Sequence, residues 1–323
     1  MRSETFLVTG GSGFLGRALI NQLMLIPECS VVAPVRDTGT HFPLGVRSLA
    51  VDDFNGANDW QEAIKGVDVV VHCAARVHVM NDTKADPLAA FREVNVDATL
   101  NLARQAAAAG VRRFIFISSI KVNGEGTEPN TAYNADDVPA PVDPYGISKL
   151  EAEQGLRLLA STTGMEMVII RPVLVYGPGV KANFLSMMRW LCRGIPLPFG
   201  AVRNRRSLVA IDNLVDLIVT CSEHPAAANQ VFLASDGEDV STTQLLRKLA
   251  GALGRPARLL PIPVWLMSGV ATLLGRHALS QRLFGSLQVD ISKNQRLLGW
   301  IPPVSLDEAL NLTAQHFLDY HTL

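Results

Sequence analysis

The stretch LVTGGSGFLG, Leu7 to Gly16, decides how the rest of the chain is interpreted. Gly10, Gly13 and Gly16 are spaced three residues apart, where a short apolar run gives way to a helical pattern. Because glycine inside a helix costs about 0.5–1 kcal/mol relative to alanine, this spacing indicates that another group approaches the backbone closely. A strand, a glycine turn and a helix N-terminus in this order favour a bound phosphate; a turn and close packing alone are the alternative.

The amino-acid composition limits which classes of binding partner we expect for this protein. The 323 residues contain 29 Lys and Arg against 30 Asp and Glu, a net charge of −1, whereas nucleic acid or an anionic membrane surface attracts a basic excess. We therefore expect a small-molecule ligand and no nucleic-acid partner. The four cysteines lie far apart without metal-ligand spacing, which predicts thiols in a reducing compartment and no metal site.

The N-terminus enters a strand at once, without the apolar segment and cleavage site of a signal peptide, so we expect a cytoplasmic protein. The most apolar stretch, LLPIPVWLMSGVATLLG at 259–275, is broken by two prolines, and its remainder is shorter than a membrane span of about 20 residues. It predicts a buried or substrate-facing helix and no membrane insertion; a peripheral membrane contact is the less favoured alternative.

Short apolar runs alternate with helical patterns over the first half of the chain. Strands are expected in TFLVTG, SVVAPV, VDVVVHCA, RFIFISS and MEMVIIRP, and helices at 14–26, 57–65, 87–109 and 146–163. This alternation predicts an α/β fold of Rossmann type, a doubly wound parallel sheet covered on both faces. Helices expected at 241–253, 263–275 and 305–320 predict a smaller, mostly helical lobe. We therefore expect a nucleotide-binding domain at 1–175, to which 211–233 can return, and a substrate lobe at 176–323.

The end of the second expected strand bears on which dinucleotide is bound. An acidic residue there would accept hydrogen bonds from the ribose hydroxyls of NAD, but the position holds Val35, followed by Arg36. An uncharged residue beside an arginine admits the 2′-phosphate of NADP and pairs its charge, so NADP(H) is favoured. NAD(H) stays open, because a shift of one residue would bring Asp37 to the ribose. A solvated surface charge is the plain alternative for Arg36.

A tyrosine and a lysine four residues apart form a candidate proton-transfer pair. Tyr145 and Lys149 open an expected helix, and their spacing puts them on one helical face. A tyrosine pKa is ordinarily about 10, and lowering it by two or three units takes about 3–4 kcal/mol of preferential phenolate stabilisation. The Lys149 ammonium and an oxidised nicotinamide can supply this together. Ser118 and Ser119 end the preceding strand, where a hydroxyl can hydrogen-bond a reacting substrate oxygen.

With these motifs the sequence resembles the extended short-chain dehydrogenase/reductase superfamily, in its nucleoside-diphosphate-sugar epimerase, dehydratase and reductase group. The resemblance covers nearly the whole chain, including RPVLVYGPG at 171–179 and RRSLVAIDNLVD at 205–216. It implies an NAD(P)-dependent enzyme whose catalytic residues are Ser119, Tyr145 and Lys149. It further implies a homodimer formed through the helices at 87–109 and 146–163.

The resemblance also implies the contacts of cofactor and substrate. The implied cofactor-binding residues are Gly10, Gly13, Phe14, Leu15, Gly16, Arg36, Asp53, Phe54, Ala74, Ala75, Arg76, Asn95, Tyr145, Lys149 and Pro172. The implied substrate-binding residues are Ser119, Tyr145, Asn183, Arg206 and Arg282, with Arg205 as the alternative to Arg206. An arginine suits the diphosphate of a UDP-linked sugar, because its planar donors can bond two oxygens at once. His72 is most simply a core histidine.

Departures from the family pattern bear on the reaction. Leu174 stands where many members carry asparagine, Asn123 replaces a tyrosine, and Ile-Lys follows Ser119 in place of the Asp-Glu pair of the dehydratases. Residues 75–83 and 120–127 resemble a bacterial subgroup that reduces UDP-2-acetamido-2,6-dideoxy-4-keto-hexoses for surface polysaccharides. Together with the preference for NADP(H), this makes a 4-ketoreductase the main prediction. A 4-epimerase of UDP-glucose or UDP-N-acetylhexosamine, a reductase of an apolar ketone, and a dinucleotide-sensing regulator without turnover are the alternatives.

Overall fold

A seven-stranded sheet forms the centre of the fold in the computed structural model, which describes residues 4–37, 39–51, 53–77, 86–128, 130–273 and 284–320. The strands lie in the order β3-β2-β1-β4-β5-β6-β9, and each neighbouring pair is parallel. They are β1 (Glu4–Thr9), β2 (Cys29–Val35), β3 (Arg47–Ala50), β4 (Val69–His72), β5 (Arg113–Ile117), β6 (Glu166–Pro172) and β9 (Val231–Ala234). The predicted Rossmann-type fold is confirmed.

The strand order reverses beside β1, and this reversal positions the site. β1 pairs with β2 on one side and with β4 on the other, so that Phe6 lies opposite both Val31 and Val69. In doubly wound sheets, ligands bind outside the carboxyl ends of the strands at such a reversal. Gly10 directly follows β1, and Ala74 lies two residues beyond β4. The glycine motif therefore begins at the reversal.

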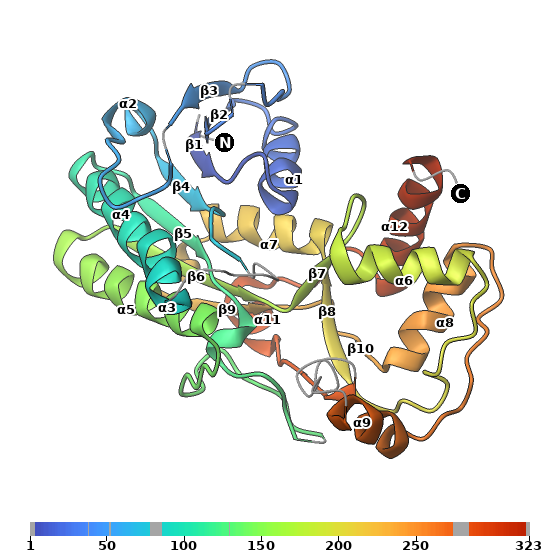
Figure 1. Ribbon diagram of the computed structural model, residues 1–323. Coiled ribbons are helices and arrows are strands. Elements are labelled where there is room, and N and C mark those ends of the chain that lie inside the picture. The colour runs from blue at the N-terminus through green and yellow to red at the C-terminus, as the bar shows by residue number, and fades with distance from the viewer. Residues whose placement is uncertain are drawn as a thin grey trace.

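Helices cover both faces of the sheet (Figure 1). On one face α1 (Phe14–Leu23) packs against α7 (Ile211–Glu223), and on the other α3 (Pro87–Arg92), α4 (Ala98–Ala108) and α5 (Pro144–Thr163) pack together. The strands between these layers are continuously apolar and buried, as a doubly covered sheet requires. β9 follows α7 back into this sheet, and α11 (Ser292–Leu298) contacts it.

The C-terminal portion of the chain forms a second group of elements (Figure 1). It holds a three-stranded sheet in the order β10-β8-β7 and a core gathered mainly from α6, α8 and α12. Its elements are β7 (Leu174–Tyr176), α6 (Ala182–Cys192), β8 (Arg206–Ala210), β10 (Asp239–Val240), α8 (Thr242–Ala252), α9 (Val264–Leu273) and α12 (Leu306–Tyr320). The mostly helical character is confirmed, but the small sheet was not predicted. None of the described helices has both the length and the apolar character that crossing a membrane requires.

Two predicted helices differ from the observed ones. Of the helix expected at 57–65 only α2 (Gln61–Ile64) forms. The reason is local: the side chains of Asn55, Asn58 and Asp59 accept hydrogen bonds from nearby backbone N–H groups and stabilise turns instead. The helix expected at 87–109 is interrupted by a π-helical segment, η1 (Glu93–Asp97), between α3 and α4. Such segments are rare and occur often at functional sites.

Candidate functional site

The glycine turn uses its three glycines in different ways. Gly10 has a φ of +69°, and a Cβ there would lie 2.8 Å from the backbone nitrogen of Ala74. A Cβ on Gly16 would lie 2.3 Å from the carbonyl oxygen of Gly10. Gly13 is exposed, and a Cβ there would meet only that same oxygen, at 3.1 Å. Turn geometry and packing therefore account for Gly10 and Gly16 but not for Gly13.

The start of α1 fits a bound diphosphate. Gly13 is the N-cap, has no side chain to satisfy the first N–H groups, and is followed by no acidic residue in the first turn. Such N–H groups and the helix dipole favour an anion. Phe14 and Leu15 lie half-buried in this turn, and the half-buried Ala74 and Ala75 follow β4 next to it. These residues fit the dinucleotide that the sequence predicts.

The residues expected to choose between NAD and NADP lie at the surface. Arg36 follows β2, and its guanidinium lies 3.7 Å from the Asp53 carboxylate. The two side chains are 71% and 91% exposed, so the pair contributes little to stability. Arg36 thus already has a carboxylate neighbour, which the sequence analysis did not foresee.

His72 is a core residue, as expected. Its ring nitrogens hydrogen bond to the hydroxyls of Thr9 and Thr99 at 2.7 and 2.9 Å. Phe54 stacks on it, with ring centroids 5.4 Å apart. Burial lowers the pKa of His72 to about 3, so the ring is neutral at physiological pH.

Asn95, in the π-helical segment, connects the loop after β4 to α5. Its Oδ1 accepts a hydrogen bond from the Arg76 N–H at 2.8 Å. Its Nδ2 donates to the Arg76 carbonyl and to the Ser148 hydroxyl, at 3.1 and 3.0 Å. Ser148 in turn donates to the carbonyl of Tyr145 at 2.8 Å. Asn95 therefore fixes the predicted cofactor loop relative to the start of α5; its direct contact with a cofactor stays a prediction.

Tyr145 lies in the first turn of α5, which Asp143 caps. Its phenol hydrogen bonds to the hydroxyl of Ser119, whereas the hydroxyl of Ser118 is buried and points to Glu153. Burial raises the pKa of Tyr145 to about 12, the Asp143 charge adds to this, and the hydrogen bond from Ser119 opposes it. The lowering of this pKa that the sequence predicts is therefore not supplied by the protein alone.

Lys149 is buried one helical turn beyond Tyr145. Its Nζ donates to the carbonyl oxygen of Ile117 at 2.8 Å and lies 4.3 Å from the centroid of the Phe116 ring. Burial lowers the pKa of Lys149 to about 7, and the charge of Glu153 works against this. The amine is thus held at the end of β5 and titrates near neutral pH.

A buried ion pair behind these residues was missed by the sequence analysis. Arg171 Nε and Nη2 donate to the two carboxylate oxygens of Glu153 at 2.9 and 2.6 Å, and both side chains are 1% exposed. The Ser118 hydroxyl donates to Glu153 at 2.6 Å, and Arg171 Nη1 donates to Asn123 Oδ1 at 2.9 Å. Two sequence features could have indicated this pair. Arg171 is a charged residue within the apolar run of β6, and Glu153 follows Lys149 by four residues.

The predicted substrate residues are only partly brought together. Asn183 is exposed at the start of α6. Pro172, predicted as a cofactor residue, ends β6 opposite Ala234. Arg206 begins β8, and its Nη1 donates to the carbonyl oxygen of Gly285 at 3.2 Å, while burial lowers its pKa. Arg282 and residues 78–85 lie outside the described part of the chain.

A basic cavity of about 550 Å³ lies beside β8, at the start of α8. Arg203, Arg205 and Arg247 line it together with Gly200 and Gln244, and no acidic residue is among its described lining. Arg205, the alternative to Arg206, is thus among the described residues that line this cavity, and Arg206 is not. Its charge suits an anionic ligand such as a diphosphate.

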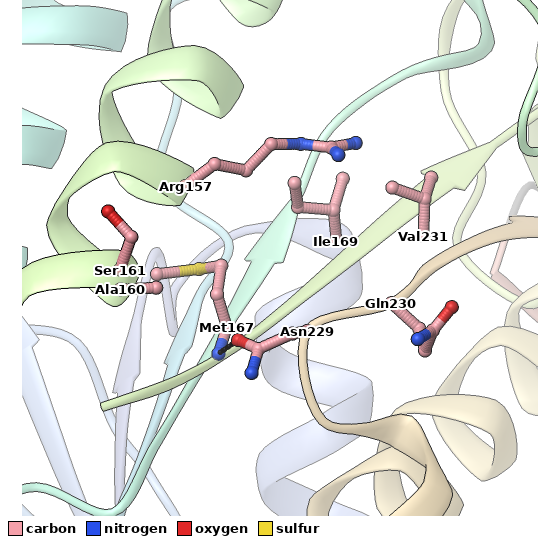
Figure 2. Close-up of a pocket in the computed structure, with 8 residues that line it drawn as sticks. All are labelled: Arg157, Ala160, Ser161, Met167, Ile169, Asn229, Gln230 and Val231. Carbon is pink, nitrogen blue, oxygen red and sulfur yellow. Dashed lines mark hydrogen bonds between the residues drawn. The ribbon is translucent and has the colours of Figure 1, made fainter. Parts of the chain in front are cut away.

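A second cavity, of about 310 Å³, lies at the far end of α5 (Figure 2). Arg157 and Ser161 of α5 face Met167 and Ile169 of β6 across it. Arg157 is 12 residues beyond Tyr145, about 18 Å along a helix that rises about 1.5 Å per residue. No sequence-predicted site residue lines the described part of this cavity.

Three comparisons relate the chain to known proteins. A family model described as "NAD dependent epimerase/dehydratase family" matches residues 6–234. A Vibrio cholerae protein named UDP-glucose 4-epimerase is 52% identical over 321 residues, covering 98% of this chain and 96% of that protein. A protein of Escherichia coli O157:H7, named N-acetyl-alpha-D-glucosaminyl-diphospho-ditrans,octacis-undecaprenol 4-epimerase, is 25% identical over 97% of this chain and 95% of its own length.

Solved structures share the fold. The UDP-glucuronic acid 4-epimerase from Bacillus cereus, solved in complex with NAD, matches with a TM-score of 0.79 at 22% identity. The match covers 98% of this chain and 97% of that one.

Proposed function

Because the chain belongs to the NAD-dependent epimerase/dehydratase family, we propose that it is a UDP-sugar 4-epimerase with a resident NAD. The observation that carries this proposal is the full-length likeness, at 52% identity, to the Vibrio cholerae protein named UDP-glucose 4-epimerase. The comparisons support 4-epimerisation better than the 4-ketoreduction that the sequence analysis favoured. The meeting of Ser119, Tyr145 and Lys149 at the end of β5 supports a reaction at a sugar hydroxyl.

The reaction removes one hydrogen from C4 and one from its hydroxyl, and returns both with inverted configuration. When bound, NAD would accept the hydride and return it to the opposite face of C4. The phenol oxygen of Tyr145 takes the hydroxyl proton and gives it back, and Ser119 hydrogen-bonds the same sugar oxygen. The Lys149 ammonium favours the phenolate through its charge. No cofactor is consumed, because both hydrogens return.

The cofactor is proposed to be NAD rather than the NADP favoured from the sequence. A resident dinucleotide that is oxidised and reduced within one turnover does not draw on the reduced NADP pool. The Asp53 carboxylate, 3.7 Å from the Arg36 guanidinium, also weakens attraction for a 2′-phosphate. The preference for NADP that the sequence predicts is tested by measuring how NAD and NADP compete for binding to the cofactor-free protein.

The nucleotide of the substrate is proposed to bind at the basic cavity beside β8. Arg203, Arg205 and Arg247 can neutralise a diphosphate there. This assigns 1–175 with β9 to the cofactor and the C-terminal portion to the substrate. A homodimer through α3, α4 and α5 is part of the same proposal, and the 68% exposed Leu158 on α5 offers apolar area for it.

The test is epimerisation without added cofactor. Purified protein is incubated with UDP-glucose or UDP-N-acetylglucosamine, the C4 epimer is followed by ¹H NMR, and dinucleotide released by denaturation is quantified. Tyr145→Phe should lower the rate by about 10²–10⁴-fold while retaining NAD. Tyr320→Phe, at a 74% exposed position on α12, is the matched control and should keep the wild-type rate.

Other outcomes separate the rival functions. Consumption of NADPH or NADH with a UDP-4-keto-6-deoxy sugar, without epimerisation, would establish the reductase in place of the epimerase. Turnover of an apolar ketone but of no UDP-sugar would support that alternative. Nucleotide binding without turnover of any of these substrates would support the sensor.

A further inference from the structure

Three ionisable side chains form a stripe along the inner face of α5. Tyr145, Lys149 and Glu153 follow one another at four-residue intervals, about 6 Å per step along the axis. Lys149 and Glu153 are each 1% exposed. The proposed proton-transfer residue is thus followed by a buried amine and then by a buried carboxylate.

The Glu153 carboxylate accepts hydrogen bonds from residues at two strands. Arg171 of β6 holds both of its carboxylate oxygens, and Ser118, at the end of β5, donates to one of them. Arg171 is itself fixed by Asn123, which donates to the carbonyl oxygen of Asn134. These three donors hold the carboxylate in place on the inner face of α5.

The other groups around Lys149 carry no charge at neutral pH. His72 and Cys73 approach it from the end of β4, and burial lowers the pKa of His72 to about 3 and raises that of Cys73 to about 12. From β5 come the Phe116 ring and the Ile117 carbonyl. Tyr145, on the same helix, is neutral because burial and Asp143 raise its pKa to about 12. Glu153, ion-paired with Arg171, is the carboxylate among these described groups.

We propose that Glu153 is a positioning residue: held by Arg171 and Ser118, its carboxylate favours the ammonium form of the buried Lys149 side chain beside the end of β5. A buried amine without an opposite charge gives up its proton, because desolvation disfavours the charged form. Lys149 can assist the Tyr145 phenolate only as an ammonium. This inference rests on the proposed function for its catalytic meaning, but the charge state of Lys149 can be measured without it.

The experiment follows Lys149 directly in the cofactor-free full chain. The protein has seven lysines, so ¹³C-lysine labelling gives few Cε signals, and Lys149→Met assigns the one of interest. Glu153→Gln alone would leave Arg171 buried and unpaired, a change that endangers folding. The test variant is therefore Glu153→Gln with Arg171→Met, which removes both charges at similar size. Glu153→Asp retains the charge and is the conservative companion.

In the double variant, the Lys149 pKa is expected to fall by at least one unit. At a given pH, the ratio of ammonium to neutral amine then falls at least tenfold. Glu153→Asp should stay within about half a unit of wild type. Glu151→Gln is the control, since Glu151 lies on the same helix but pairs with Arg92, whose side chain is 48% exposed. In the loaded enzyme, the high-pH limb of kcat should move to lower pH with KM unchanged.

Two results would overturn the inference. One is a Lys149 titration in the folded double variant that matches wild type. The other is a fall of more than about half a unit in the Lys149 pKa in Glu153→Asp, because the charge is retained there. Absence of UDP-sugar epimerisation in wild type would refute the proposed function and leave the NMR result standing.

Discussion

Separate substitutions of Gly16 and Gly13 should show which glycine is needed for packing and which for phosphate binding. In Gly16→Ala the new Cβ would lie 2.3 and 2.7 Å from the carbonyl oxygen and carbon of Gly10, so α1 or the turn must move. Overpacking of this kind costs about 1–3 kcal/mol, and alanine returns about 1 kcal/mol of helix propensity. The net loss of stability is therefore about 0–2 kcal/mol, and the displaced helix loses dinucleotide affinity as well.

Gly13→Ala meets a single backbone oxygen at 3.1 Å and should cost under about 1 kcal/mol, mostly because alanine is a poorer N-cap than glycine. Its methyl group would occupy the approach to the first N–H groups of α1, and NAD affinity should fall at least tenfold. Urea unfolding of the cofactor-free variants gives the stabilities, and calorimetric titration gives the affinities. Unchanged NAD affinity in Gly13→Ala, or equal destabilisation by both variants, would refute the reasoning.

Two further predictions follow from Lys149 and Arg205. Burial lowers the folded-state pKa of Lys149 to about 7 from the ordinary 10.5, so between about pH 7 and 10 the unfolded chain binds the extra proton. The unfolding free energy of cofactor-free wild type should therefore rise with pH relative to Lys149→Met, and parallel urea-derived curves would contradict this. Arg205→Ala should raise KM for the UDP-sugar about tenfold or more at constant kcat. Arg157→Ala, in the cavity of Figure 2, should leave steady-state KM unchanged and is its control.

The chain's local spacings were sufficient to predict the fold and to place Tyr145 and Lys149 on one helix. Continuous apolar strands, three glycines at one spacing and a Tyr-x-x-x-Lys pair are all patterns within one element or one turn. A helix brings residues four apart to one face whatever surrounds it, so Tyr145 and Lys149 could be paired from sequence. The helix expected at 57–65 failed for an equally local reason, the competing asparagine and aspartate turns.

Tertiary structure decided the contacts between distant parts of the chain. Whether Ser118 or Ser119 faces Tyr145, whether Arg205 lines the basic cavity, and which carboxylate lies near Arg36 depend on how strands and loops are placed together. Glu153 of α5 pairs with Arg171 of β6, 18 residues further along the chain. No periodic pattern in the sequence predicts this contact. Periodicity fixes which face a side chain takes within its own element. Only tertiary packing determines which side chain from another element it contacts. That partner in turn affects the charge state of a buried group such as Lys149.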